Sequence, residues 1–127
     1  MGEKIIQEQL HQYNIYKFKG VDKWLEYMSL FDEFCDYNWN QAQACSEKIN
    51  KQLGLSGIAK TNPIDTLNQW RSRSTKLGLD GVPEVAINSM IYRGNFVEDG
   101  IRSAFCASLT DPPEYCSDPE KATADSE

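Results

Sequence analysis

The sequence lacks most of the features that reveal a function directly. No Cys-x-x-Cys pair occurs among its four cysteines, so the motif that gives thiol–disulfide enzymes their reactive thiolate is missing. Its single histidine, His11, has no cluster of cysteines or carboxylates at metal-ligand spacing, and we expect a surface or satisfied side chain there. No apolar run approaches the roughly 20 residues that a membrane helix needs. We therefore expect no metal, no cofactor and no membrane span.

Positive charge is also scarce. The 127 residues carry 13 Lys and Arg against 19 Asp and Glu, which gives a net charge of −6. This balance argues against a nucleic-acid surface. Hydrophobic residues make up 40% of the chain and charged residues 25%, proportions that are typical of a globular domain and not of a disordered one. We expect one domain or a piece of one, and no signal peptide at the N-terminus.

Helical spacing dominates the first 80 residues. Apolar residues recur there every three or four positions, and the pattern predicts four helices, at about residues 3–13, 21–35, 40–53 and 63–77. Asn62-Pro63 combines a capping residue with a proline at the first helical position, which marks a helix start. We expect the second helix to bury Trp24, Leu25, Met28, Phe31 and Cys35, and the fourth to bury Ile64, Leu67 and Trp70.

A short β-hairpin is predicted at about residues 83–93. Because proline cannot donate to a sheet ladder, Pro83 belongs at the start of a strand or at an edge. The Val82–Pro83 bond is also a candidate for the cis form. A two-residue turn and a second strand follow, and a last helix is expected at about residues 97–109.

The four cysteines fall into two pairs of equal spacing, Cys35/Cys45 and Cys106/Cys116. Cys35 and Cys45 lie at equal distances on either side of Asn40, so two antiparallel helices joined there bring both side chains to the same height. A proline bend can fold Cys116 back onto Cys106. Two such disulfides would indicate an oxidising compartment, whereas four buried free thiols would indicate the cytosol. Four cysteines allow three connectivities, so this pairing is an inference.

Two Cys-x9-Cys pairs also mark small helical-hairpin proteins of the mitochondrial intermembrane space. In that family each pair lies on one continuous helix, and the two helices are close in sequence. Here Pro112-Pro113 breaks any helix through the second pair, and sixty residues separate the pairs. The mitochondrial intermembrane space therefore stays as the alternative location.

Four segments together carry a family resemblance. They are an aromatic helix that ends in cysteine, a Cys-helix-Leu-Gly segment, a Pro-strand-Asn and Tyr-Arg-Gly hairpin, and a closing cysteine pair: Trp24-Leu25-Glu26-Tyr27 with Phe31 and Cys35, Ala44-Cys45-Ser46-Glu47-Lys48-Ile49 with Leu53-Gly54-Leu55, Pro83-Glu84-Val85-Ala86-Ile87-Asn88 with Tyr92-Arg93-Gly94, and Cys106 with Pro112-Pro113 and Cys116. From about Gln9 to Cys116 the chain thus resembles the central luminal region of vacuolar sorting receptors. Two further cysteines of that family, near Asn14 and near Thr61, are absent here.

A wider resemblance links Gly81-Val82-Pro83 and the preceding helices to bacterial disulfide oxidoreductases, which insert a helical subdomain into a thioredoxin fold. The resemblance implies an α+β, mostly helical chain. A helical subdomain (residues 1–80) is followed by the ββα C-terminal half of a thioredoxin-like fold (81–116) and an acidic, mobile tail (117–127). The first βαβ half, which carries the redox cysteines of such enzymes, is missing. We therefore expect no catalysis, and we expect an excised part, or one chain, of a larger assembly.

The candidate binding site is the entry to the hairpin. In thioredoxin-like folds the residue before this proline resembles an open strand edge, which pairs with extended peptides. The candidate residues are Val82, Pro83, Tyr92 and Arg93, although Val82 could be no more than the entry to a strand. The preferred hypothesis is a non-catalytic protein- or peptide-binding module of the secretory or endomembrane lumen or of the extracellular space. The alternatives are a structural subunit whose half-sheet completes a neighbour, and part of a thiol–disulfide oxidoreductase with its Cys-x-x-Cys elsewhere.

Overall fold

The computed structural model of the protein describes residues 2–35 and 38–117. The chain forms two compact units, an N-terminal unit of residues 1–68 and a C-terminal unit of residues 69–127. Helix α4 (Pro63–Leu77) contains the division between them, whereas the division expected from the sequence follows residue 80. Apart from Ser117, the acidic tail expected at residues 117–127 lies outside the described residues.

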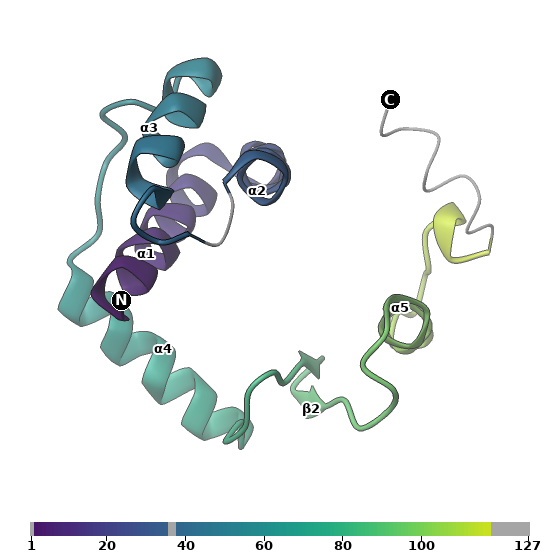
Figure 1. The fold of residues 1–127 in the computed structure, drawn as a ribbon. Coiled ribbons are helices and arrows are strands. Elements are labelled where there is room, and N and C mark those ends of the chain that lie inside the picture. Colours follow the sequence, from purple (N-terminus) through teal and green to yellow (C-terminus); the bar gives the residue numbers. More distant parts are fainter. Residues whose placement is uncertain (1, 36–37, 118–127) are drawn as a thin grey trace. The chain divides into compact units, whose positions relative to one another are not determined.

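Three helices pack together in the N-terminal unit: α1 (Gly2–Lys19), α2 (Val21–Phe34) and α3 (Ala42–Leu53) (Figure 1). Helix α2 contacts both α1 and α3. Helix α1 is longer than the expected span of 3–13, because it continues to Lys19 and buries Ile15 completely. Gly20 alone separates α1 from α2, and its φ of 92° lies in the left-handed region that glycine adopts without strain.

The core of this unit combines the inner faces of the three helices with the loop after α3. Its buried members are Ile15, Tyr27, Cys35, Ile49 and Leu55. The expectation that Leu25 and Met28 are buried is wrong, since their exposed fractions are 50% and 37%. Helix α2 is apolar around most of its circumference, so spacing alone does not fix which arc faces the core. Ile64, at 70% exposed, is a further wrong expectation, because α4 buries Thr66 instead.

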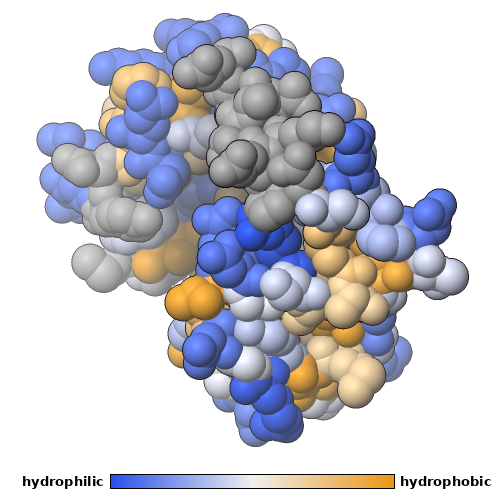
Figure 2. Space-filling view, turned by 90° about the vertical axis from the view of Figure 1, so that its right-hand side faces the viewer, coloured by the Kyte–Doolittle hydropathy of each residue, from blue (hydrophilic) through white to orange (hydrophobic). Residues whose placement is uncertain are grey.

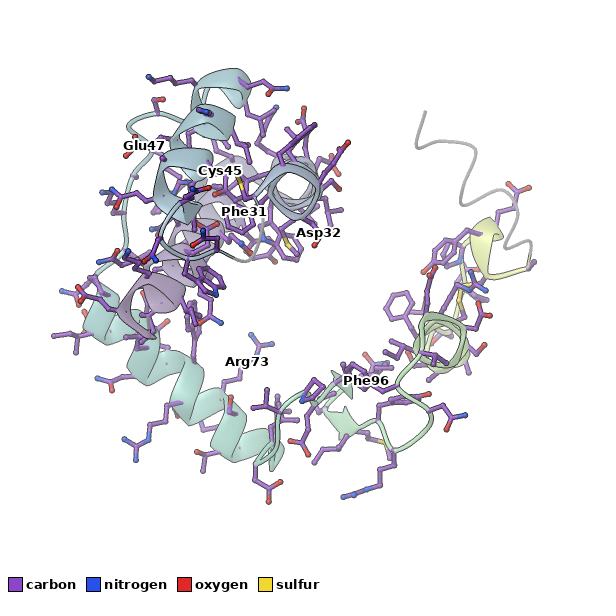
Figure 3. All side chains as sticks on the ribbon, in the orientation of Figure 1. Phe31, Asp32, Cys45, Glu47, Arg73 and Phe96 are labelled. Atoms are coloured by element: carbon purple, nitrogen blue, oxygen red, sulfur yellow. A yellow bond between two sulfur atoms is a disulfide. The ribbon has the colours of Figure 1, made fainter. Side chains whose placement is uncertain are left out.

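Both predicted disulfides are confirmed. Cys35, at the end of α2, is bonded to Cys45 on α3, as its placement opposite Asn40 suggested. Figure 3 shows Phe31 and Cys45 on these neighbouring helices. In the C-terminal unit Cys106 is bonded to Cys116. These bridges fit a secreted or lumenal protein.

The C-terminal unit contains the end of α4, a hairpin, a helix and a single 3₁₀ turn. These elements are β1 (Ala86–Ile87), β2 (Met90–Ile91), α5 (Glu98–Ala107) and η1 (Glu114–Cys116). Helix α5 contacts η1, to which the disulfide joins it.

Helix α4 begins where Asn62-Pro63 predicted it. The Asn62 side chain accepts a hydrogen bond from the backbone N–H of Asp65 at 3.1 Å, which is the bond of an N-cap. Pro63 takes the first helical position, where no N–H is required.

The described residues thus form an α+β chain that is mostly helical, with one two-stranded antiparallel sheet. None of the helices in residues 2–35 and 38–117 is long and apolar enough to cross a membrane.

Candidate functional site

The predicted binding edge lies on the hairpin of the C-terminal unit. Its strands pair Ala86 with Ile91 and Ile87 with Met90. The two turn residues, Asn88 and Ser89, have φ angles of 48° and 66°. Positive φ at both central positions is typical of the type I′ turn that joins two strands directly. A short, regular hairpin therefore occupies the centre of the predicted segment.

The chain enters this hairpin through Val82 and Pro83. The peptide bond between them is cis, and the side chain of Val82 is 99% exposed. Just before them, the Glu84 carboxylate accepts hydrogen bonds from the backbone N–H groups of Asp80 and Gly81, both at 2.9 Å. The loop is thus tied to the start of the hairpin, and Val82 faces solvent.

The outer edge of β1 has no neighbouring strand among the described residues. Val85 accepts a hydrogen bond from the N–H of Tyr92 at 2.8 Å, so it faces β2 as Ile87 does. Backbone groups alternate in direction along a strand, so those of Ala86, which lies between Val85 and Ile87, point away from β2. The edge, defined here as residues 82–86, thus presents a donor and an acceptor at Ala86 and carries the exposed Val82.

Tyr92 and Arg93 follow β2 and differ in what they can offer a ligand. Arg93 is exposed. Tyr92 is half-buried, and its hydroxyl donates a 2.6 Å hydrogen bond to the carbonyl oxygen of Asn95. A Cβ at Gly100 would lie 2.6 Å from this hydroxyl. The Tyr92 ring therefore holds the loop between β2 and α5, and of the pair only Arg93 is open.

The C-terminal unit exposes several large apolar side chains in addition to Val82. Met90 is 76% exposed, and the exposed fractions of Val97, Phe96 and Phe105 are 56%, 53% and 40%. Figure 3 shows Phe96 between the hairpin and α5, and the space-filling view of Figure 2 shows apolar side chains, in orange, at the surface. None of the described residues from 69 to 117 is buried, so this described part of the C-terminal unit has no interior of its own.

A second candidate site is a cavity of about 380 Å³ in the N-terminal unit. Its walls come from α1, α3, the first residue of α4 and the segments before α3 and α4, and they combine polar with apolar surface. The lining includes Lys4, Glu8, His11, Asn14, Trp39, Ser46, Asn50, Lys60 and Thr61.

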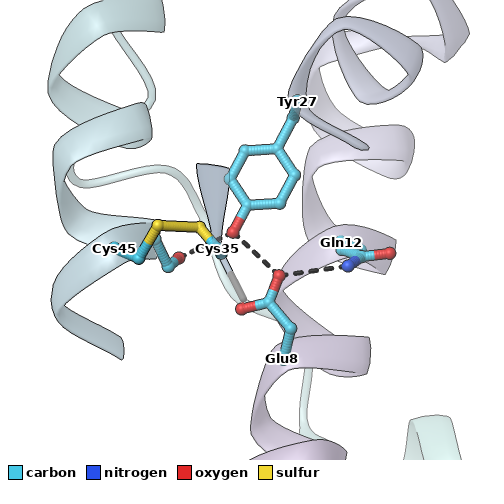
Figure 4. Close-up of a disulfide and its surroundings, with 6 residues drawn as sticks. Glu8, Gln12, Tyr27, Cys35 and Cys45 are labelled. Atoms are coloured by element: carbon cyan, nitrogen blue, oxygen red, sulfur yellow. Dashed lines mark hydrogen bonds between the residues drawn. A yellow bond between two sulfur atoms is a disulfide. The ribbon is translucent and has the colours of Figure 1, made fainter. Parts of the chain in front are cut away.

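Glu8 is the most unusual residue of this cavity, because it is a carboxylate with only 8% of its surface exposed. Its Oε1 accepts hydrogen bonds from Tyr27 at 2.8 Å and from Gln12 at 3.1 Å (Figure 4). The Tyr27 hydroxyl also shares a 2.6 Å hydrogen bond with Ser46. The cluster thus ties α1, α2 and α3 together beside the Cys35–Cys45 bridge.

Burial changes the acidity of both titratable groups in this cluster. Loss of water raises the pKa of Glu8, although the bonds from Gln12 and Tyr27 and the nearby His11 oppose that rise. Burial also raises the pKa of Tyr27 far above its usual range. The phenol therefore stays neutral, and the carboxyl holds its proton more tightly than an exposed Glu does.

Sequence reasoning did not find the cavity. His11, expected to be satisfied or on the surface, is half-buried and bonded through Nε2 to Asn50 Oδ1 at 2.8 Å. One signal was present: Glu8 shares the helical face of Ile5, Gln12 and Ile15, so a charged residue interrupts a stripe that is otherwise directed at the core.

Comparison with known proteins adds no relative: no protein-family model, curated protein or solved structure matches the chain. Within residues 2–35 and 38–117, no group of three His, Cys, Asp or Glu side chains is placed to hold a metal ion.

Proposed function

We propose that the protein is a non-catalytic protein- or peptide-binding module, and that its ligand adds as an extended strand to the edge at residues 82–86. Strand addition uses main-chain hydrogen bonds for affinity and side-chain contacts for specificity. The edge offers both, through the outward backbone groups of Ala86 and through the side chain of Val82.

One observation carries the proposal. Val82, a large apolar residue, is 99% exposed next to an unpaired strand edge, in a unit where no described side chain is buried. An isolated two-stranded hairpin is marginally stable in water. A partner that extends the sheet would cover apolar surface and satisfy the edge in a single step.

The family resemblance supports the same function and suggests its place. A vacuolar-sorting-receptor-like module would work in the secretory or endomembrane lumen, where disulfides form. The intermembrane space of mitochondria is the alternative. The proposal also includes a thioredoxin-like fold that lacks its βαβ half, and a chain that does not catalyse thiol–disulfide exchange. The burial of Cys35 supports the lack of catalysis, because a thiolate must reach a disulfide before exchange.

A second candidate is a structural subunit whose half-sheet completes a neighbouring chain. The lack of buried residues in 69–117 favours it, since the unit would gain its interior only in the assembly. It shares the edge with the first proposal but requires a permanent partner.

Selection of a random peptide library against the disulfide-bonded chain tests the proposal. Selected peptides are expected to slow hydrogen exchange of the Ala86 amide. The Val82→Asp variant is expected to lose at least about tenfold in affinity, because the new carboxylate would have to be buried against the peptide.

Met90→Asp is the matched control, because Met90 is a similarly exposed apolar residue at the other end of the same hairpin. Its effect is expected to stay within about twofold, as for an ordinary surface change. Equal losses in the two variants, or protection confined to residues outside the hairpin, would contradict strand addition at 82–86. A chain that is stably multimeric by light scattering would favour the structural subunit.

A further inference from the structure

The cavity of the N-terminal unit has the size of a small-molecule site. Its volume of about 380 Å³ lies at the lower end of the range for ligand pockets, about 300–1,000 Å³. Apolar residues form part of the wall, among them Leu10, Trp39 and Pro63. All of these lining residues belong to the N-terminal unit, so the cavity does not depend on the hairpin.

Glu8 is a buried carboxylate on this wall that belongs to no ion pair among the described residues, and the only charged group that acts on it is His11, from the same helix. The ion pairs of the described residues join Lys23 to Glu26 and Arg102 to Asp99, and neither reaches Glu8. Its neighbours are neutral donors, Gln12 and Tyr27, and both donate to Oε1. A carboxylate has acceptor sites on both oxygens, so Glu8 retains capacity for another donor. Since buried carboxylates are normally paired, this wall favours a ligand with a positive group.

Two lysines supply the opposite charge at the exposed rim. Lys4 comes from α1 and donates to Asn40 Oδ1 at 3.3 Å, and Lys60 comes from the loop before α4. Both are exposed, whereas Glu8 lies at the buried end of the lining. The lining also includes the exposed Glu47, so the rim has two positive charges and one negative charge. The site therefore has a buried carboxylate at one end and a net positive rim, with apolar wall available for a side chain.

From this arrangement we infer that the cavity binds a zwitterionic α-amino acid with an apolar side chain. Its ammonium group donates to the Glu8 carboxylate, and its carboxylate faces Lys4 and Lys60. Burial is the main cause of the raised pKa of Glu8, and an ammonium group beside the carboxylate would oppose that rise.

Calorimetric titration of the disulfide-bonded chain with L-leucine tests the inference. L-Leucine is expected to bind, and N-acetyl-L-leucine, whose nitrogen is uncharged, to bind at least about tenfold more weakly. L-Leucinamide, which keeps the ammonium but lacks the carboxylate, is expected to bind about threefold more weakly, since exposed lysines contribute less than a buried pair. These three arms need no variant.

Variants locate the site. Glu8→Gln keeps an acceptor for Tyr27 and Gln12 but removes the charge, and it is expected to weaken L-leucine at least about tenfold. Glu33→Gln is the control, because Glu33 is an exposed carboxylate on α2 that is not among the lining residues, and a change within about twofold is expected. The inference is overturned by no heat from L-leucine at millimolar concentration, by equal binding of the N-acetylated or amidated compound, or by an unchanged affinity in a folded Glu8→Gln variant.

Discussion

The two units of this chain are stabilised by different means. In the N-terminal unit, Ile15 and Tyr27 have no exposed surface, and a disulfide, a buried carboxyl and three helices meet around them. In the C-terminal unit, no described residue is buried, and individual bonds hold the elements in place. They include the Cys106–Cys116 disulfide, the hydrogen bond from Tyr92 to Asn95, and the bond from the Asn88 amide to the Ser108 carbonyl at 3.1 Å.

This difference suggests that the two units differ in how far their folding depends on a partner. Burial of apolar surface is the main favourable term in folding, whereas an internal hydrogen bond adds only about 1 kcal/mol net. The N-terminal unit therefore has the means to fold alone. The C-terminal unit is expected to gain stability from a partner that covers its open side chains and its strand edge.

The largest expected effect is a core truncation. Tyr27→Ala is expected to cost about 3–5 kcal/mol of the free energy of unfolding, because it empties a site that is fully buried and removes a donor to Glu8. Phe105→Ala in the C-terminal unit is expected to cost less than about 1 kcal/mol, since its ring is 40% exposed. Urea unfolding measures both. Similar losses for the two variants would mean that burial of side chains stabilises the C-terminal unit as much as the N-terminal unit.

A smaller effect is expected at Gly100 in α5. A Cβ there would lie 2.6 Å from the Tyr92 hydroxyl and 2.8 Å from the Asn95 carbonyl oxygen. Gly100→Ala is therefore expected to destabilise the C-terminal unit by about 1–3 kcal/mol, although alanine favours a helix interior over glycine by about 1 kcal/mol. Hydrogen exchange of the α5 amides reports the change.

Gly2→Ala serves as the control for this substitution, because a Cβ at Gly2 meets nothing within 4 Å. Its effect is expected to be close to zero. If Gly100→Ala instead slows hydrogen exchange in α5, the contact of Tyr92 and Asn95 with Gly100 does not constrain the helix.

The smallest expected effect depends on pH. Burial raises the pKa of Glu8 above its ordinary value of 4.5, so the folded chain holds this proton more tightly than the unfolded chain. Its contribution to stability is complete below the unfolded pKa and is lost as pH rises through the folded pKa. Glu8→Gln is therefore expected to match the wild type at pH 4 and to exceed it in stability at pH 8.

Urea unfolding at the two pH values measures this difference. Glu26→Gln provides the comparison, since Glu26 forms an exposed ion pair with Lys23 and its removal should change stability by less than about 1 kcal/mol at either pH. Because His11 also acts on Glu8, the same pair of measurements in a His11→Gln background separates the two groups. A gain from Glu8→Gln that is larger at pH 4 than at pH 8 would reverse the assignment.

The sequence predicted the parts of the fold that depend on neighbouring residues. The helix start at Asn62-Pro63 and a hairpin within residues 83–93 follow from local backbone chemistry, and the structure contains both, with strands at Ala86–Ile87 and Met90–Ile91. The disulfides were predictable because each joins two cysteines that are close in sequence, on either side of a turn.

The parts that depend on distant residues were not predictable. Leu25 and Tyr27 are both acceptable on a core face, and only the arrangement of α1 and α3 selects Tyr27. Glu8 is buried because Tyr27 and Ser46 come from other helices to meet it. The cavity beside it has lining residues from four separate segments, and no single segment carries a pattern for it.

The Cys35–Cys45 bridge also determines whether proteolytic cleavage between the two cysteines separates the fragments. Between these cysteines, Asn40 and Gln41 lie exposed in the connection from α2 to α3, and exposed connections are preferred sites of cleavage. A cut there would give two polypeptides, yet the sulfur–sulfur bond would keep α2 and α3 in one molecule. The nick would appear on a denaturing gel only after a reductant is added, because until then the disulfide joins the two fragments.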